Sequence, residues 1–135
     1  MKFKFLPHTA DLKFEAYGKT LGEVFENSAL ALTNSLSEKK IKPVEKKKIK
    51  IKGRDLEALM FRFLEELLFL YEMKGFLISK AKVKISKDNK KLEADLDGEE
   101  KMEKTARHYI KAITYHDMFV KKIGKTWVAQ VVLDV

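Results

Sequence analysis

Hydrophobic and polar residues alternate in several stretches of the chain. A period of two residues is typical of a strand that buries one face and exposes the other. The stretches are residues 12–18, 44–52, 76–85, 92–96, 114–123 and 126–134. A turn at Asp88-Asn89 and another at Gly124 join the last four stretches in pairs. The pattern therefore predicts six strands, the last four of them in two hairpins.

Two segments between these strands carry apolar residues at helical spacing. The first begins at Thr20, which with Glu23 three residues later forms a capping box. The second opens near Asp55 and ends at Gly75, a residue typical of helix C-caps. Apolar side chains cover well over a third of the second helix, which indicates a central core helix. A shorter, more polar helix is predicted over residues 99–112.

The order of these elements indicates the fold class. Single helices are mixed with runs of strands that are connected mainly by hairpins, which is typical of α+β proteins. We therefore expect a mixed or antiparallel sheet packed with two long helices and one shorter helix. A length of 135 residues with 45% hydrophobic content suits one compact domain over residues 1–135.

The composition excludes several kinds of site. The chain has no cysteine, so a disulfide, a thiolate zinc site and a cysteine nucleophile are excluded, and any metal must be bound by oxygen or imidazole. Its glycines are dispersed and its serines lack a nucleophile elbow, which argues against a phosphate-binding loop and serine hydrolysis. No apolar stretch reaches the roughly 20 residues that span a bilayer. We expect a soluble, cytoplasmic protein that does not contact membranes.

The net charge of +8 would attract anionic partners without identifying them. The densest basic run, Lys46–Lys52, alternates lysine with isoleucine in its second half. That alternation indicates a strand with a solvated lysine face, which also discourages edge pairing. Contact with nucleic acid is the alternative, although the scarcity of arginine and of interleaved aromatic residues argues against reading bases. Both interpretations stay open.

Polar residues that could form a site lie at both ends of the chain. His8-Thr9-Ala10-Asp11 stands near the start, and Asp134-Val135 closes the sequence. Oxygen-rich groups at opposite termini could converge in a folded domain. Such a convergence would form a small acidic pocket for a cation.

Four segments in order make the whole chain resemble archease, the small accessory protein of the tRNA-splicing RNA ligase. The segments are His8–Asp11 followed by Tyr17-Gly18, the helix Asp55–Leu59 running into Phe63–Leu68, the stretch Ile110–Met118, and the terminal Leu133–Val135. Each segment alone would be a weak signal. Their order over the right length makes the resemblance specific.

The resemblance implies a non-catalytic role. Archeases help the ligase that joins RNA ends bearing a 3′-phosphate, or a 2′,3′-cyclic phosphate, to a 5′-hydroxyl, and they promote its guanylylation and turnover. The implied partner is that ligase, with RNA contacted weakly or indirectly. In this family a divalent cation, commonly calcium, is bound at positions that correspond here to Asp11, Asp134 and Val135. We therefore expect calcium, with magnesium or manganese as alternatives.

Physical reasoning supports the same three residues. Asp134 offers a side-chain carboxylate and Val135 the free α-carboxylate, while Asp11 brings a third. Three carboxylates close together would repel and raise one another's pKa values unless a cation neutralises them. All-oxygen ligation suits calcium or magnesium, and calcium better tolerates irregular geometry. The alternative for Asp11 is a turn or a helix cap.

Three further residues are candidate contacts with the partner. His8 lies three residues before Asp11, so one turn would put both on one side, and His116 could join His8. Lys111 could engage phosphate or a carboxylate of the partner. A structural histidine and a solvated lysine are the alternative interpretations. His108 is expected at the surface.

Two other functions compete with ligase activation. The first is a general chaperone, modulator or binding module for RNA- or DNA-processing proteins, which the positive charge supports. The second is a metal-dependent hydrolase, which lacks a convincing general base beyond His8 or His116.

Overall fold

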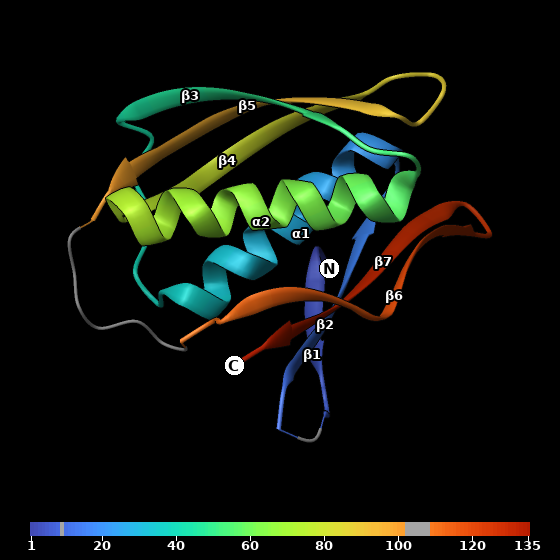
Figure 1. Ribbon diagram of the computed structural model, residues 1–135, viewed down its shortest axis with the longest axis horizontal. Helices are drawn as coiled ribbons and strands as arrows, with labels where there is room; N and C mark the ends of the chain where they lie inside the picture. The colour runs from blue at the N-terminus through green and yellow to red at the C-terminus, as the bar shows by residue number, and fades with distance from the viewer. Residues whose placement is uncertain (9, 102–108) are drawn as a thin grey trace.

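Two helices lie between two antiparallel sheets in the computed structural model, which describes residues 1–8, 10–101 and 109–135 (Figure 1). The first sheet has the order β1 (Phe3–Leu6), β2 (Leu12–Gly18), β7 (Thr126–Asp134), β6 (Ala112–Ile123). The second has the order β3 (Glu45–Lys52), β5 (Lys91–Glu100), β4 (Phe76–Ile85). Every strand pair is antiparallel, so the α+β class is confirmed, with two sheets in place of one.

The helices are α1 (Leu21–Leu36) and α2 (Leu56–Lys74). Thr20 is the N-cap that was predicted: its Oγ1 accepts a hydrogen bond from the Glu23 amide at 3.1 Å. The second helix opens at Asp55 as expected, and this residue also caps it, since it accepts a bond from a first-turn amide at 2.8 Å. Gly75 ends α2 with a φ of 66°, the left-handed conformation that favours glycine. These local signals fix where each helix starts and where α2 ends.

The core fills the space between the helices and the two sheets. Phe14 of β2 and Val131 of β7 are fully buried, as are Phe25 of α1 and Phe63 of α2. The rings of Phe25 and Phe63 lie with their centroids 6.2 Å apart, so the two helices meet in the middle layer. Burial of these apolar faces is the main force that holds the three layers together.

The shorter helix predicted over residues 99–112 is wrong in the parts that the structure describes. Glu99 and Glu100 continue β5 and pair with β4, and residues 109–111 are not helical. Residues 102–108 lie outside the described part of the chain. A neighbouring strand satisfies the backbone groups of Glu99 and Glu100 directly, whereas a short polar helix lacks an apolar face that would stabilise it.

The first strand of the structure was not predicted. β1 pairs with β2 from Phe3 beside Ala16 to Leu6 beside Lys13. It forms one edge of the first sheet, so only one side of its backbone is paired.

None of the helices in the described ranges is long and apolar enough to cross a membrane.

Candidate functional site

The predicted acidic residues of the two termini lie at one end of the first sheet. Leu12 of β2 pairs with Leu133 of β7, and Asp11 and Asp134 are the chain neighbours of this pair. Leu133 is fully buried against the core. Asp134 is the last residue of β7, whereas Asp11 lies just before β2 and follows Ala10, which has a φ of 66°. The two acidic residues therefore belong to the same end of the sheet, and their convergence on one cation stays a prediction.

Two further residues belong to this end of the sheet. The Lys111 amide donates a hydrogen bond to the Asp134 carbonyl at 2.7 Å, while the residue itself is exposed. Val135 packs partly against the core. The sheet thus gathers Asp11, Asp134 and Val135 where β2 and β7 adjoin, and binding of a cation there stays a prediction. Thr9 and His108 lie outside the described residues.

The two predicted histidines come together beside this acidic pair. The rings of His8 and His116 lie with their centroids 6.1 Å apart, edge to face. His8 Nδ1 is 3.9 Å from Asp11 Oδ2, so the histidines adjoin the predicted cation site. The expectation that His116 would join His8 is confirmed. The side chain of His8 is 19% exposed and that of His116 67% exposed, so His116 is the more accessible to a partner.

Asp117 belongs to the same cluster and was not predicted. Its Oδ2 lies 3.4 Å from His116 Nε2 and 3.8 Å from Lys13 Nζ. The register of β6 against β7 shifts between Thr114 and Phe119, and Asp117 takes a φ of 54° within that irregularity. The signal that could have found it is the adjacent polar pair His116-Asp117 inside an otherwise alternating strand.

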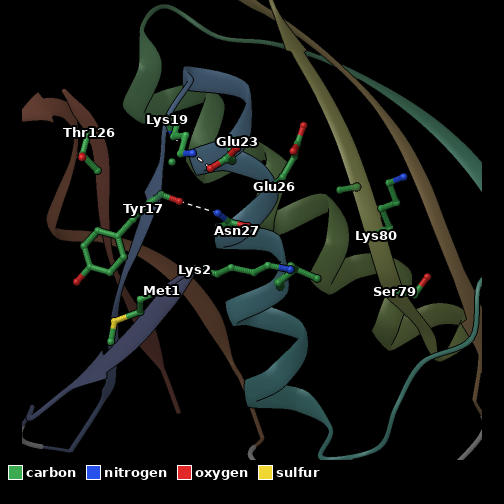
Figure 2. Close-up of a pocket in the computed structure, with 13 residues that line it drawn as sticks. Met1, Lys2, Tyr17, Lys19, Glu23, Glu26, Asn27, Ser79, Lys80 and Thr126 are labelled. Carbon is green, nitrogen blue, oxygen red and sulfur yellow. Dashed lines mark hydrogen bonds between the residues drawn. The ribbon is translucent and has the colours of Figure 1, made fainter.

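A separate hollow of about 680 Å³ opens at the other end of β2 (Figure 2). Two of its polar side chains already bind within the protein: Asn27 Nδ2 donates to the Tyr17 carbonyl at 2.6 Å, and Glu26 accepts from the Val83 amide at 2.9 Å. Partial burial raises the pKa of Tyr17, and so does its hydrogen bond to Glu15. These contacts fasten α1 to β2 and β4, so this hollow has a structural explanation.

Comparisons with known proteins all indicate the same family. Residues 3–135 match the Archease protein family. The chain is 38% identical over 137 residues to "Protein archease" of Sulfurisphaera tokodaii, covering 99% of both chains. It is 42% identical over 141 residues to "Protein archease" of Thermococcus kodakarensis, covering 98% of both.

Two solved structures share the fold. The solution structure of Methanobacterium thermoautotrophicum protein 1598 matches with a TM-score of 0.81 and 32% identity, covering 99% of both chains. The crystal structure of an archease from Thermotoga maritima, described as a possible chaperone, matches with a TM-score of 0.67 and 21% identity, covering 98% of this chain and 96% of that one.

Proposed function

Because the chain belongs to the archease family, we propose that it is a non-catalytic activator of the GTP-dependent tRNA-splicing RNA ligase. In this proposal it promotes guanylylation and multiple turnover of the ligase through a docking surface that a divalent cation organises. The observation that supports it is the pairing of Leu12 with Leu133, because Asp11 precedes the first of these residues and Asp134 and Val135 follow the second. Catalysis stays with the ligase.

The proposed cation is calcium, with magnesium or manganese as alternatives. Asp11 and Asp134 supply side-chain carboxylates, and Val135 supplies its main-chain carboxylate. Hard oxygen donors of this kind match calcium, which accepts six to eight oxygen ligands in flexible geometry. The cation would join the residue before β2 to the end of β7 and so stiffen the surface between them. His8, His116 and Lys111 flank that surface as contacts for the partner.

The proposed mechanism is a shift in the conformational population of the ligase. Docking favours the ligase conformation in which its own catalytic group accepts GMP, so the activator adds no reacting group. A bound protein shifts such an equilibrium only by its difference in affinity for the two conformations. The cation-organised surface is the part of the activator that would make this distinction.

Single-turnover transfer of GMP to the cognate ligase tests the proposal. We expect the transfer rate to rise when the protein is added, and the rise to disappear when a calcium chelator is present. Equal rates with and without the protein would contradict the role as activator. A stimulation that survives chelation would leave the activator role intact and refute the role of the cation.

The outer face of the second sheet favours a second candidate function, an RNA-binding module. In three successive rows an acidic residue of β5 lies between a lysine of β3 and a lysine of β4. The rows are Lys46-Asp97-Lys80, Lys48-Asp95-Lys82 and Lys50-Glu93-Lys84, and Lys52 pairs with Lys91 beyond them. Eight lysines against three acidic residues leave this face with a net charge of +5.

The acidic residues do not neutralise both columns of lysines. Each forms its ion pair with β3, at 3.4 Å for Lys46 with Asp97 and 3.7 Å for Lys48 with Asp95. Among the described residues no ion pair joins β5 to the lysines of β4. Exposed pairs of this kind contribute little stability, so the lysines can turn to an incoming phosphate at small cost. This face would attract the phosphodiester backbone without reading sequence.

Reversing charge on this face should weaken RNA binding. The double variant Lys48→Glu, Lys82→Glu should lower the affinity for single-stranded RNA and lower the slope of log K against log salt by about 1.4, since each phosphate contact contributes roughly 0.7. The matched control is Lys122→Glu, Lys125→Glu, which changes the net charge equally at the β6–β7 hairpin of the other sheet. Fluorescence anisotropy over a salt series measures both. An equal loss of RNA affinity in the two variants would mean that only net charge matters. That result would contradict RNA binding by this face.

A further inference from the structure

Three metal-ligating side chains converge beside Asp11, one of the predicted calcium residues. His8, His116 and Asp117 each offer a ligand atom, and these atoms all lie within 4.8 Å of one another. We propose that these residues form a second metal site, selective for a transition metal of the zinc type. The inference does not depend on ligase activation, because it concerns only the side chains of this chain.

The spacing of the donors fits a tetrahedral ion. Metal–ligand bonds of about 2.0–2.2 Å place two ligand atoms of a tetrahedral site about 3.3–3.6 Å apart. His116 Nε2 and Asp117 Oδ2 are 3.4 Å apart, so two of the three ligands already have this separation. The ligand atom of His8 lies within 4.8 Å of the other two, so it has to approach by at most about 1.5 Å to complete the set. Its ring faces that of His116 edge to face, so neither ring blocks the other.

One nitrogen of His8 is an unsatisfied polar atom at this site. Its Nδ1 is buried and has no hydrogen-bond partner. The nearest carboxylate oxygen that forms an ion-pair contact with it, Asp11 Oδ2, is 3.9 Å away, which is too far for a hydrogen bond. Buried polar atoms are normally satisfied, and an unsatisfied one calls for an explanation such as an ion. An ion bound by His8 would give this ring a polar partner that the described part of the protein does not supply.

The backbone of β6 places two consecutive residues, His116 and Asp117, in the same cluster. Regular strand alternation would send His116 and Asp117 to opposite faces of the sheet. The irregularity between Thr114 and Phe119, with Asp117 at a φ of 54°, breaks that alternation. Gln130 Nε2 holds the turn by donating to the Asp117 carbonyl at 2.8 Å. The conformation is therefore fixed by a neighbouring strand in the absence of any ion.

The donor set determines the class of metal. Two imidazoles and one carboxylate suit zinc and its neighbours among the transition metals, whereas calcium prefers an all-oxygen set. Three protein ligands leave a fourth position for water or for a donor from a partner. Lys13 opposes the ion, because its Nζ lies 3.8 Å from Asp117 Oδ2 and would share that carboxylate with the metal. The wild-type affinity should thus be lower than that of a variant without this ammonium.

Titration of the metal-free protein with Co²⁺, followed by visible absorption, tests the site. Tetrahedral Co²⁺ gives intense d–d bands, and Zn²⁺ should abolish them by displacement. We expect these bands in the wild type and at least a tenfold weaker affinity in His116→Asn, since loss of a supporting group alone typically costs 10- to 100-fold. His116 is largely exposed, so its replacement should leave the thermal midpoint unchanged. The variant Lys13→Met should bind Co²⁺ more tightly than the wild type.

Asp134→Asn is the matched control, because it removes a carboxylate from the predicted calcium residues and none from the proposed site. It should weaken calcium binding and leave the Co²⁺ bands in place. Absence of tetrahedral bands in the wild type would overturn the proposal. So would equal Co²⁺ affinity in His116→Asn and the wild type, or parallel loss of both metals in both variants, which would mean one shared site.

Discussion

Replacing Gly98 with alanine should lower the free energy of unfolding by about 3–5 kcal/mol, at the upper end of what single substitutions cost. A Cβ at this position would lie 2.0 Å from the Leu77 carbonyl oxygen and 2.9 Å from the Leu77 carbonyl carbon. Both are backbone atoms of the neighbouring strand β4, so no side-chain rotation can relieve the clash. The β4–β5 pairing has to open locally, in the middle of the second sheet.

The close approach at Gly98 follows from an irregularity in β4. The register of β4 against β5 shifts between Ile78 and Lys80, leaving Ser79 as an extra residue. Such a bulge bends its strand and brings one backbone nearer to the other. Ser79 Oγ donates to the Asp97 carbonyl at 3.1 Å and holds this bend. Gly98 is therefore required by the shape of the partner strand, and not by its own dihedral angles.

Urea unfolding measures this prediction, with Gly124→Asn as the control. Gly124 has a φ of 64° and no atom within 4 Å of a Cβ, and asparagine tolerates the left-handed conformation. The control should therefore unfold within about 1 kcal/mol of the wild type. A loss below about 1 kcal/mol for Gly98→Ala would mean that the two strands can separate freely, and would contradict the close packing described for them.

Elements with local signals could be predicted from the sequence. The N-cap hydrogen bonds of Thr20 and Asp55 and the left-handed Gly75 involve neighbours within a few residues, so the sequence alone specifies them. The hairpins at Asp88-Asn89 and Gly124 are equally local. The division of seven strands into two sheets is not, because it depends on which distant strands pair, and turn residues carry no information on that choice.

The two errors in the predicted elements have the same origin. β1 has only four residues and lies at an edge, so its alternation of phenylalanine and lysine is too short to identify without its partner β2. Residues Glu99 and Glu100 are polar and look helical by propensity, yet β4 extends far enough to pair with them. In both cases a strand is specified by its neighbour, which a pattern along one segment cannot show.

The same difference between local and long-range determinants applies to the candidate site. Asp11 and Asp134 were predicted from their residue types and from the resemblance to archease, and the pairing of Leu12 with Leu133 brings their chain neighbours together. Asp117 was missed because its orientation depends on the irregular pairing of β6 with β7. A one-residue change of register reverses which side chains face outward. The histidine cluster therefore became visible only once the sheet was assembled.

Replacing Asp11 with asparagine should remove calcium-dependent stabilisation and with it the stimulation of the ligase. If calcium binds the folded state alone, an excess of 100 Kd stabilises it by about 2.7 kcal/mol. For a domain of this size that corresponds to a rise in the thermal midpoint of roughly 10 °C. The asparagine retains the size of the side chain but carries no charge, so the variant should melt at the same temperature with and without calcium.

The calcium response should be lost completely in Asp11→Asn because the predicted site has few ligands. Asp11 is the only predicted ligand from the β2 end, so its loss separates that chain end from the end of β7. In calcium-free solution the variant should be within about 0.5 kcal/mol of the wild type, because the Asp11 side chain is 33% exposed and its ion-pair contact with His8 is long, at 3.9 Å. Differential scanning fluorimetry over a calcium series and single-turnover GMP transfer measure the two consequences in the same samples.

Asp117→Asn is the control that separates the acidic residues from the histidine cluster. Asparagine suits the left-handed conformation of position 117, so the turn in β6 should persist. This variant should retain both the calcium-dependent rise in melting temperature and the stimulation of GMP transfer, while losing the Co²⁺ bands. If Asp11→Asn still stimulates GMP transfer fully, the acidic residues serve the fold alone. If Asp117→Asn also loses the calcium response, the acidic residues and the histidine cluster bind one shared ion. The proposed cation site would then have to include the ligands of both groups.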